Sequence, residues 1–227
     1  FLVGGEAGTA PEPEPAAPPS VVATPTEPGP TGAAPSEQPS EQPSEPSDGV
    51  VTDRQRADVD GDGRPDEVRV LLHGSTPDEP ATGTVEVTLA SGATGAAEMP
   101  FGYPPRLLPA FDVNGDGREQ VLMSHTAGGD SAQLLVYTWH EDGLVQAEVE
   151  GDAPLALELD GQGTVAHYYV DDRGLFSWRR LDPVDLSGGS RFTVEQWKWS
   201  VEGDRLRPTP SAEGCVDVTG TEPPGPC

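Results

Sequence analysis

Short runs of alternating polar and apolar residues extend over the chain from Glu67 onward. In residues 84–89 the alternation is strict, and residues 192–201 form the longest run. Period-two alternation in short runs is typical of antiparallel strands that bury one face. Less regular runs of the same kind lie at 67–72, 120–123, 134–139, 144–149, 164–170 and 175–178. Because no stretch has helical periodicity, the pattern predicts an all-β fold, with hairpin turns at Asp142-Gly143 and Gly203-Asp204.

An Asp- and Gly-rich motif recurs ahead of the strand-like runs. Residues 57–64 read Ala-Asp-Val-Asp-Gly-Asp-Gly-Arg, and residues 111–118 read Phe-Asp-Val-Asn-Gly-Asp-Gly-Arg. A decayed third copy lies at 157–164. The copies are about 50 residues apart, the length of one four-stranded propeller blade. We therefore predict about three propeller-blade-like antiparallel repeats. Since this is too few to close a propeller, the alternatives are an incomplete or open stack, another kind of closure, or completion by a second chain.

The first copy has the oxygen atoms of a cation-binding loop. Side-chain oxygens occupy its first, third, fifth and ninth positions, and a backbone carbonyl is available at the seventh; the residues are Asp58, Asp60, Asp62, Asp66 and Arg64. Calcium accepts a loose shell of oxygen ligands, whereas magnesium requires a strict octahedron and zinc prefers Cys or His. Calcium is therefore the favoured ion. The alternative is an ordinary Asp-Gly hairpin turn, but four regularly spaced acids exceed what a turn requires.

The residues around the loops exclude an EF-hand and indicate another family. An EF-hand requires flanking helices and a Glu at the twelfth position, where Arg69 and Met123 stand inside strand-like runs. The loops resemble FG-GAP or VCBS-type repeats, which also build the propeller of integrin α-subunits. The second copy carries more of that pattern, from Phe101-Gly102 to the loop, although Val121-Leu122-Met123-Ser124 replaces the Gly-Ala-Pro of the family. The resemblance covers roughly residues 58–170.

The resemblance implies a calcium ion in each of the first two loops. The first would be held by the residues given above. The second would be held by Asp112, Asn114, Asp116, Arg118 and Gln120. Because Gln120 replaces a carboxylate, we expect weaker binding at the second site. The third copy keeps only Glu158 and Asp160, so we expect no ion there.

Composition divides the chain into two parts. Residues 1–53 contain no Lys, Arg or His, are rich in Pro, Ser and Glu, and repeat Ser-Glu-Gln-Pro at 36–39 and 40–43. Such a segment cannot bury enough apolar surface to fold, and dense proline favours an extended chain. We therefore expect a disordered stalk at 1–53 and an all-β domain at 54–227. The opening Phe1-Leu2-Val3 looks like the trimmed end of a signal or anchor helix, so that a membrane anchor would be missing from this fragment; a start within a linker is the alternative.

The charge and the cysteines restrict the partners and the compartment. The net charge is -26, with 13 Lys and Arg against 39 Asp and Glu. Such a balance excludes nucleic acid as a partner, disfavours anionic membranes and favours cations. Cys215 and Cys227 are close enough in sequence for a disulfide that closes a short C-terminal loop. That spacing fits an oxidising, extracytoplasmic compartment.

No residue pattern indicates catalysis. Ser131 follows Gly129-Asp130 but lacks a nucleophile elbow, and the four histidines lack ligand spacing. Six aromatic residues could form either core or a carbohydrate-stacking platform, of which core is favoured: Trp139, Tyr168, Tyr169, Trp178, Trp197 and Trp199.

The sequence thus predicts a non-enzymatic, extracytoplasmic calcium-binding β-module on a stalk, secreted or anchored at the cell surface, which binds or adheres to an unidentified protein or carbohydrate. The alternatives are a carbohydrate-binding or hydrolytic accessory domain, and a structural cell-envelope protein.

Overall fold

The computed structural model describes residues 49–74, 82–99, 105–128, 131–141, 143–160, 163–183, 191–217 and 221–227. The chain divides into two units, Phe1–Ser44 and Glu45–Cys227, and all described residues belong to the second. Most of the expected stalk, and Phe101-Gly102 of the family pattern, lie outside the described residues. Among the described residues, we find no helix with the length and hydrophobicity that a membrane span needs.

The described residues form β-sheets whose strand pairs are antiparallel except for β9 (Glu148–Val149) with β14 (Arg205–Asp217), which confirms the predicted all-β class. The strands are β1 (Val50–Ala57), β2 (Asp66–His73), β3 (Thr82–Thr88), β4 (Thr94–Met99), β5 (Arg106–Leu107), β6 (Val121–Gly128), β7 (Ser131–His140), β8 (Gly143–Gln146), β9 (Glu148–Val149), β10 (Ala156–Asp160), β11 (Gly163–Asp171), β12 (Gly174–Pro183), β13 (Arg191–Glu202) and β14 (Arg205–Asp217). The first strand begins at Val50, so the β domain starts before the boundary that composition suggested.

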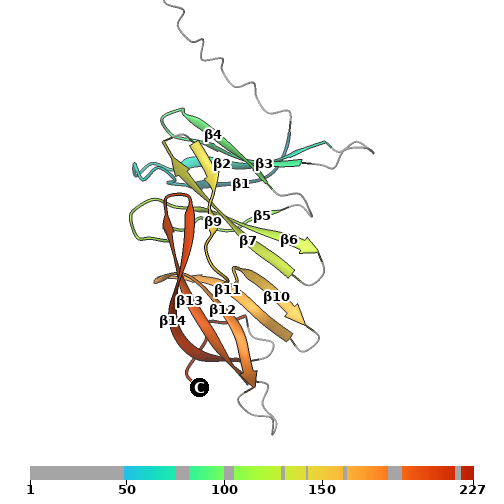
Figure 1. Ribbon diagram of the computed structural model, residues 1–227. Coiled ribbons are helices and arrows are strands. Elements are labelled where there is room, and N and C mark those ends of the chain that lie inside the picture. The colour runs from blue at the N-terminus through green and yellow to red at the C-terminus, as the bar shows by residue number, and fades with distance from the viewer. Residues whose placement is uncertain are drawn as a thin grey trace, which may run out of the picture. The chain divides into compact units, whose positions relative to one another are not determined.

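The first repeat forms a separate four-stranded sheet. Its order β1-β2-β3-β4 is a simple antiparallel meander (Figure 1). The remaining strands follow one hydrogen-bonded path, β5-β6-β7-β10-β11-β12-β13-β14-β9, with β8 paired to β7. Neither path closes into a barrel within the described residues. The second and third repeats therefore share one sheet, and the propeller-like arrangement of the three repeats stays a prediction.

Strands β6 and β7 lie between two hydrophobic clusters. Val121 and Met123 pack with Val68 and Val85 of the first sheet in one cluster. Leu122, between them in sequence, packs with Trp199 in the other. Because successive side chains of a strand point to opposite faces, a strand buried on both faces becomes a continuous apolar run. The weak alternation of residues 120–123 and 134–139 has this cause.

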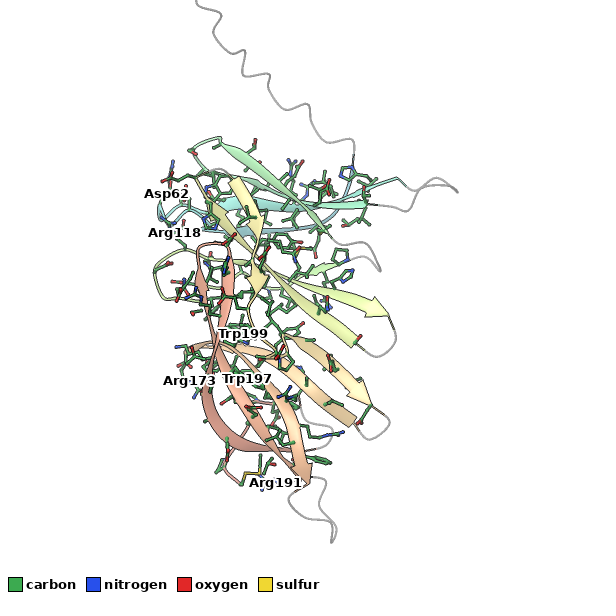
Figure 2. All side chains as sticks on the ribbon, viewed as in Figure 1. Asp62, Arg118, Arg173, Arg191, Trp197 and Trp199 are labelled. Carbon is green, nitrogen blue, oxygen red and sulfur yellow. A yellow bond between two sulfur atoms is a disulfide. The ribbon has the colours of Figure 1, made fainter. Side chains whose placement is uncertain are left out.

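Most of the tryptophans belong to the core. Trp178 and Trp199 are fully buried, and Trp197 is 7% exposed. The Trp199 indole N–H donates to Ser177 Oγ at 2.8 Å, which satisfies its polar atom inside the protein. Figure 2 shows Trp197 and Trp199 on the same strand, β13. The three partly buried aromatics of the predicted set, Trp139, Tyr168 and Tyr169, pack against the hydrophobic clusters. The interpretation as core is therefore confirmed for Trp178, Trp197 and Trp199.

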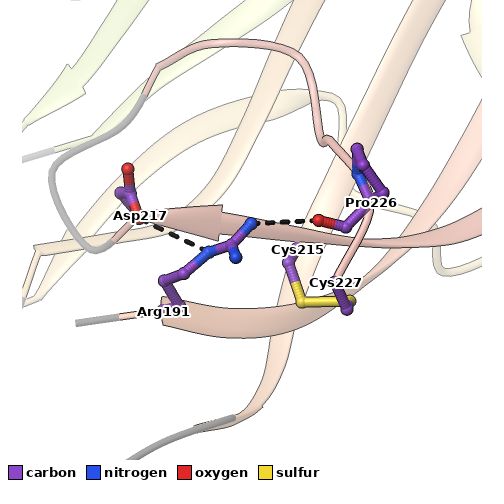
Figure 3. Close-up of a disulfide and its surroundings, with 5 residues drawn as sticks. All are labelled: Arg191, Cys215, Asp217, Pro226 and Cys227. Carbon is purple, nitrogen blue, oxygen red and sulfur yellow. Dashed lines mark hydrogen bonds and ion pairs between the residues drawn. A yellow bond between two sulfur atoms is a disulfide. The ribbon is translucent and has the colours of Figure 1, made fainter. Parts of the chain in front are cut away.

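The C-terminal segment is held by the predicted disulfide. Cys215 and Cys227 are bonded, with their Cα atoms 5.0 Å apart. Two backbone hydrogen bonds join Cys215 to Gly225, and Arg191 donates to the Pro226 carbonyl at 3.0 Å while it faces Asp217 (Figure 3). The disulfide is typical of proteins from oxidising compartments. The hairpin turn predicted at Gly203-Asp204 is also confirmed, since Glu202 and Arg205 are paired across it.

Candidate metal centre

The first Asp-rich loop connects β1 to β2 at the edge of the four-stranded sheet. Its ends are fixed because Ala57 and Asp66 are register partners in the ladder. Gly61 and Gly63 have φ angles of 76° and 82°, in the left-handed region that glycine adopts without steric cost. Val59, between the first two acids of the loop, is buried in the cluster between the sheets. The loop is thus a tight turn anchored by one core residue.

The carboxylates of the loop accept hydrogen bonds from its own backbone. Asp58 accepts the N–H groups of Gly61 and Gly63 at 3.0 and 2.8 Å. Asp60 accepts the N–H of Asp62 at 3.1 Å. These bonds hold the acidic side chains toward the inside of the turn.

Asp66 is the buried member of the group and has a structural role. Its side chain is 1% exposed, and its two oxygens accept the N–H groups of Val59 at 2.9 Å and of Ala90 at 2.8 Å. Burying a charge without a partner is costly, whereas two N–H bonds compensate part of that cost. Asp66 therefore ties the loop to the turn between β3 and β4.

Three of the predicted ligands come together. One carboxylate oxygen from each of Asp58, Asp60 and Asp66 lies within 4.8 Å of the other two. In the described residues, this is the one group of three or more such side chains that could hold a metal ion. Carboxylate oxygens are the ligands of hard divalent cations, and a cation would relieve the repulsion among the three negative charges. The residues present therefore fit a divalent cation.

Asp62 does not join this group. Its carboxylate accepts hydrogen bonds from the Arg64 side chain at 2.9 and 2.5 Å, and the Arg64 guanidinium holds the pKa of Asp62 below its usual value. Both side chains are exposed, so the pair contributes little stability. The Arg64 side chain supplies a positive charge beside the cluster, and ligation of an ion by its carbonyl oxygen stays a prediction.

The second Asp-rich loop repeats the turn but uses its side chains differently. Asp112 accepts the N–H groups of Gly115, Asp116 and Gly117 at 2.7–3.1 Å. Gln120 is in the place of Asp66 and accepts the Val113 N–H at 2.8 Å, while its amide donates to the Arg118 carbonyl at 3.0 Å. The protein's own backbone thus satisfies the Gln120 amide.

Asn114, the predicted ligand at the third position, is bonded outside its loop. Its amide nitrogen donates to the carbonyl of Val201, and its oxygen accepts the Val201 N–H, both at 2.8 Å. Asp116 accepts the N–H of Arg118 at 3.0 Å. The second loop thus has two carboxylates, Asp112 and Asp116, against the three that converge in the first, and ion binding at the second loop stays a prediction.

The two loops contact each other through Glu119, which the sequence did not single out. The Asp58 N–H donates to Glu119 Oε2 at 2.7 Å, and the Glu119 N–H donates to the Asp58 carbonyl at 2.8 Å. Arg118 also lies on the first loop: a Cβ on Gly61 would be 2.8 Å from Arg118 Cγ and 3.6 Å from its Nε. Asp62 and Arg118 accordingly appear at the same end of the first sheet in Figure 2. No local pattern indicates a contact between residues so distant in sequence.

The other residues that the sequence analysis considered, namely the third motif copy, Ser131 and the histidines, lie in strands and hairpins. The third motif copy forms the β10–β11 hairpin, with Asp160 paired to Gly163 across the turn, although Gly161 and Gln162 lie outside the described residues. Ser131 is the first residue of β7, and the preceding Gly129-Asp130 is outside the described part of the chain. His73 shares a 2.9 Å hydrogen bond with Thr84 rather than facing a metal-ligand group.

Comparisons of the chain with protein-family models, with curated proteins and with solved structures found no match. The resemblance of the Asp-rich loops to FG-GAP or VCBS-type repeats therefore stays a prediction, and the geometry of the first loop is the basis of the functional argument.

Proposed function

We propose that the chain is an extracytoplasmic calcium-binding β-module in which the first Asp-rich loop holds the ion. The observation that carries this proposal is the convergence of Asp58, Asp60 and Asp66 within 4.8 Å of one another. Calcium is favoured over zinc because the group offers only oxygen. It is favoured over magnesium because an irregular set of three carboxylates suits a large ion with loose geometry.

The ion would act mainly on the fold. Asp66 ties the loop to the turn after β3, and Asp58 ties it to the second loop, so a bound cation would hold together segments from both sheets. A ligand that binds only the folded state stabilises it in proportion to its occupancy. Calcium would thus make the module rigid where calcium is abundant, as it is outside the cytoplasm.

The proposed biological role is binding or adhesion at the cell surface or in a secreted protein. The Cys215–Cys227 disulfide supports an oxidising compartment. The net charge of -26 supports partners that are not nucleic acids. The resemblance to repeats that build integrin propellers points in the same direction. The partner would be a protein or a carbohydrate.

Thermal unfolding of the full chain in calcium, in magnesium and in chelator tests the proposal. At a calcium concentration about 100 times the dissociation constant, we expect stabilisation of about 2.7 kcal/mol. For a domain of this size, such stabilisation raises Tm by about 5–10 °C. Magnesium should raise Tm less. An unchanged Tm in calcium and chelator would contradict the proposal, and an equal rise in both ions would contradict the assignment of calcium.

A further inference from the structure

We propose that the second Asp-rich loop is a clamp that needs no cation and joins the first loop to the β13–β14 hairpin. The clamp consists of two reciprocal pairs, Asp58 with Glu119 and Asn114 with Val201. Each pair has two hydrogen bonds that run in opposite directions. Together they connect three segments that are far apart in the sequence.

The Asn114 side chain is chemically suited to the clamp. A carboxamide has a donor and an acceptor, so Asn114 can bond the N–H and the carbonyl of Val201 at the same time. An ionised Asp has no donor, and its charge would face the Val201 carbonyl. The equivalent residue of the first loop is Asp60, which accepts one N–H bond within its own loop. The exchange of Asp60 for Asn114 is thus one of the differences that give the second loop a partner outside its own turn.

The other ligand positions of the second loop already have protein partners. Asp112 accepts three backbone N–H groups, and Gln120 both accepts and donates a backbone bond. These bonds hold the turn closed with protein donors alone. The first loop has similar backbone bonds, but the second loop has only two carboxylates, Asp112 and Asp116, and so offers less negative charge to a cation.

The clamp connects the two principal hydrophobic clusters. Val59 anchors the first loop in the cluster between the sheets. Val113 anchors the second loop in the other cluster, to which Val201 also belongs. The clamp thus joins the first loop, anchored in one cluster, to the second loop and to β13, which are both anchored in the other cluster. The backbone N–H and carbonyl of Asp58 bond Glu119, so a cation held by the Asp58 carboxylate should make these two hydrogen bonds open less often. This last step rests on the proposed function.

Amide hydrogen exchange of the full chain, read at the N–H groups of Val201 and Glu119, tests the clamp. Because a hydrogen bond contributes about 1 kcal/mol, Asn114→Ala should speed exchange at Val201 by about fivefold. Asn114→Asp should speed exchange at Val201 at least as strongly, because a carboxylate cannot donate a hydrogen bond to the Val201 carbonyl. Asp116→Asn is the matched control in the same loop and should leave Val201 exchange unchanged. Unchanged exchange at Val201 in both Asn114 variants would overturn the clamp.

Calcium binding to the same proteins separates the clamp from the proposed function. Binding of one calcium ion per chain, both in the wild type and in Asp116→Asn, supports the clamp. Binding of two ions by the wild type and of one by Asp116→Asn would overturn it. If calcium in the first loop strengthens the clamp, calcium should slow amide exchange at Glu119 and Val201 in the wild type and should not slow it in Asp60→Ala. Calcium binding without slower exchange at these residues would overturn this link between the ion and the clamp. If no calcium binds, the proposed function fails, and faster Val201 exchange in Asn114→Ala alone still supports the clamp.

Discussion

Asp58 and Glu119 bond each other reciprocally, with the Asp58 N–H on Glu119 Oε2 at 2.7 Å and the Glu119 N–H on the Asp58 carbonyl at 2.8 Å. The same Asp58 uses its carboxylate inside its own loop, where it accepts Gly61 and Gly63 and lies near Asp60 and Asp66. One residue therefore belongs both to the candidate cation site and to the contact between the two loops. Changes at Glu119 should affect both.

Replacement of Glu119 tests the contact between the loops. Glu119→Ala leaves the partly buried Asp58 N–H without its acceptor, so we expect a loss of about 1–2 kcal/mol in the free energy of unfolding. Glu119→Gln keeps an acceptor oxygen and should lose less. Chemical denaturation of both variants measures the two values. Equal losses in Ala and Gln would show that the hydrogen bond to Asp58 is not the important feature.

Replacement of Asp66 should affect the fold before it affects any ion. Asp66→Ala removes the acceptor of one buried and one partly buried N–H group, and we expect a loss of about 2–4 kcal/mol even in chelator. Asp66→Asn keeps one acceptor and turns a donor toward the other N–H, so its loss should be smaller. Denaturant unfolding in chelator provides the comparison. If Asp66→Ala were destabilising only in calcium, the structural role of Asp66 would be wrong.

The strands that the sequence predicted are those with alternating side chains and clear turn residues. Residues 84–89 and 192–201 correspond to β3 and β13 because one face of each is buried. The strand β4 was missed because its small residues, such as Gly95 and Ala96, show little contrast between its faces. The first cation group was predicted because its ligands share one loop. The contacts of Glu119 and Asn114 were not, because tertiary pairing between distant segments leaves no periodic signal.

Arg118 should lower the affinity of the first loop for a cation. Its side chain lies on Gly61, so it brings a positive charge to the loop that carries Asp60 and Asp62. Arg118→Gln removes the charge and keeps much of the side chain, and we expect calcium affinity to rise about two- to fivefold at low ionic strength. Arg106→Gln, on β5, is the matched control for net charge. An equal rise in both variants would indicate a general effect of net charge rather than a local one.

Stability should fall below neutral pH because of His167. Burial lowers the pKa of His167 below its ordinary value of about 6.5, and its ring is stacked on Trp178. The unfolded chain then binds the proton more readily than the folded protein. The stabilising effect of the neutral ring is therefore complete above about pH 6.5 and is lost as the pH falls toward the folded-state pKa.

Melting curves between about pH 7.5 and pH 5.5 measure this effect, and His167→Gln should reduce the loss of Tm across that interval. The lowered carboxyl pKa values of Glu150 and Asp171 do not contribute in this interval, because carboxylates of this kind remain ionised until the pH approaches about 4. His73→Gln is the matched control. If both variants and the wild type lose the same Tm, His167 is not the titrating group.

Calorimetric titration of the full chain with calcium tests the central claim most directly, with Asp60→Ala and Asp116→Asn as the paired variants. Asp60 is the better site for this test than Asp66 because its side chain makes one exposed hydrogen bond within its own loop, so its loss should not disturb the fold. We predict one binding event in the wild type, absent in Asp60→Ala and unchanged in Asp116→Asn. No binding heat up to roughly millimolar calcium, the weak end of the range for extracellular modules, or binding that persists in Asp60→Ala, would contradict the account.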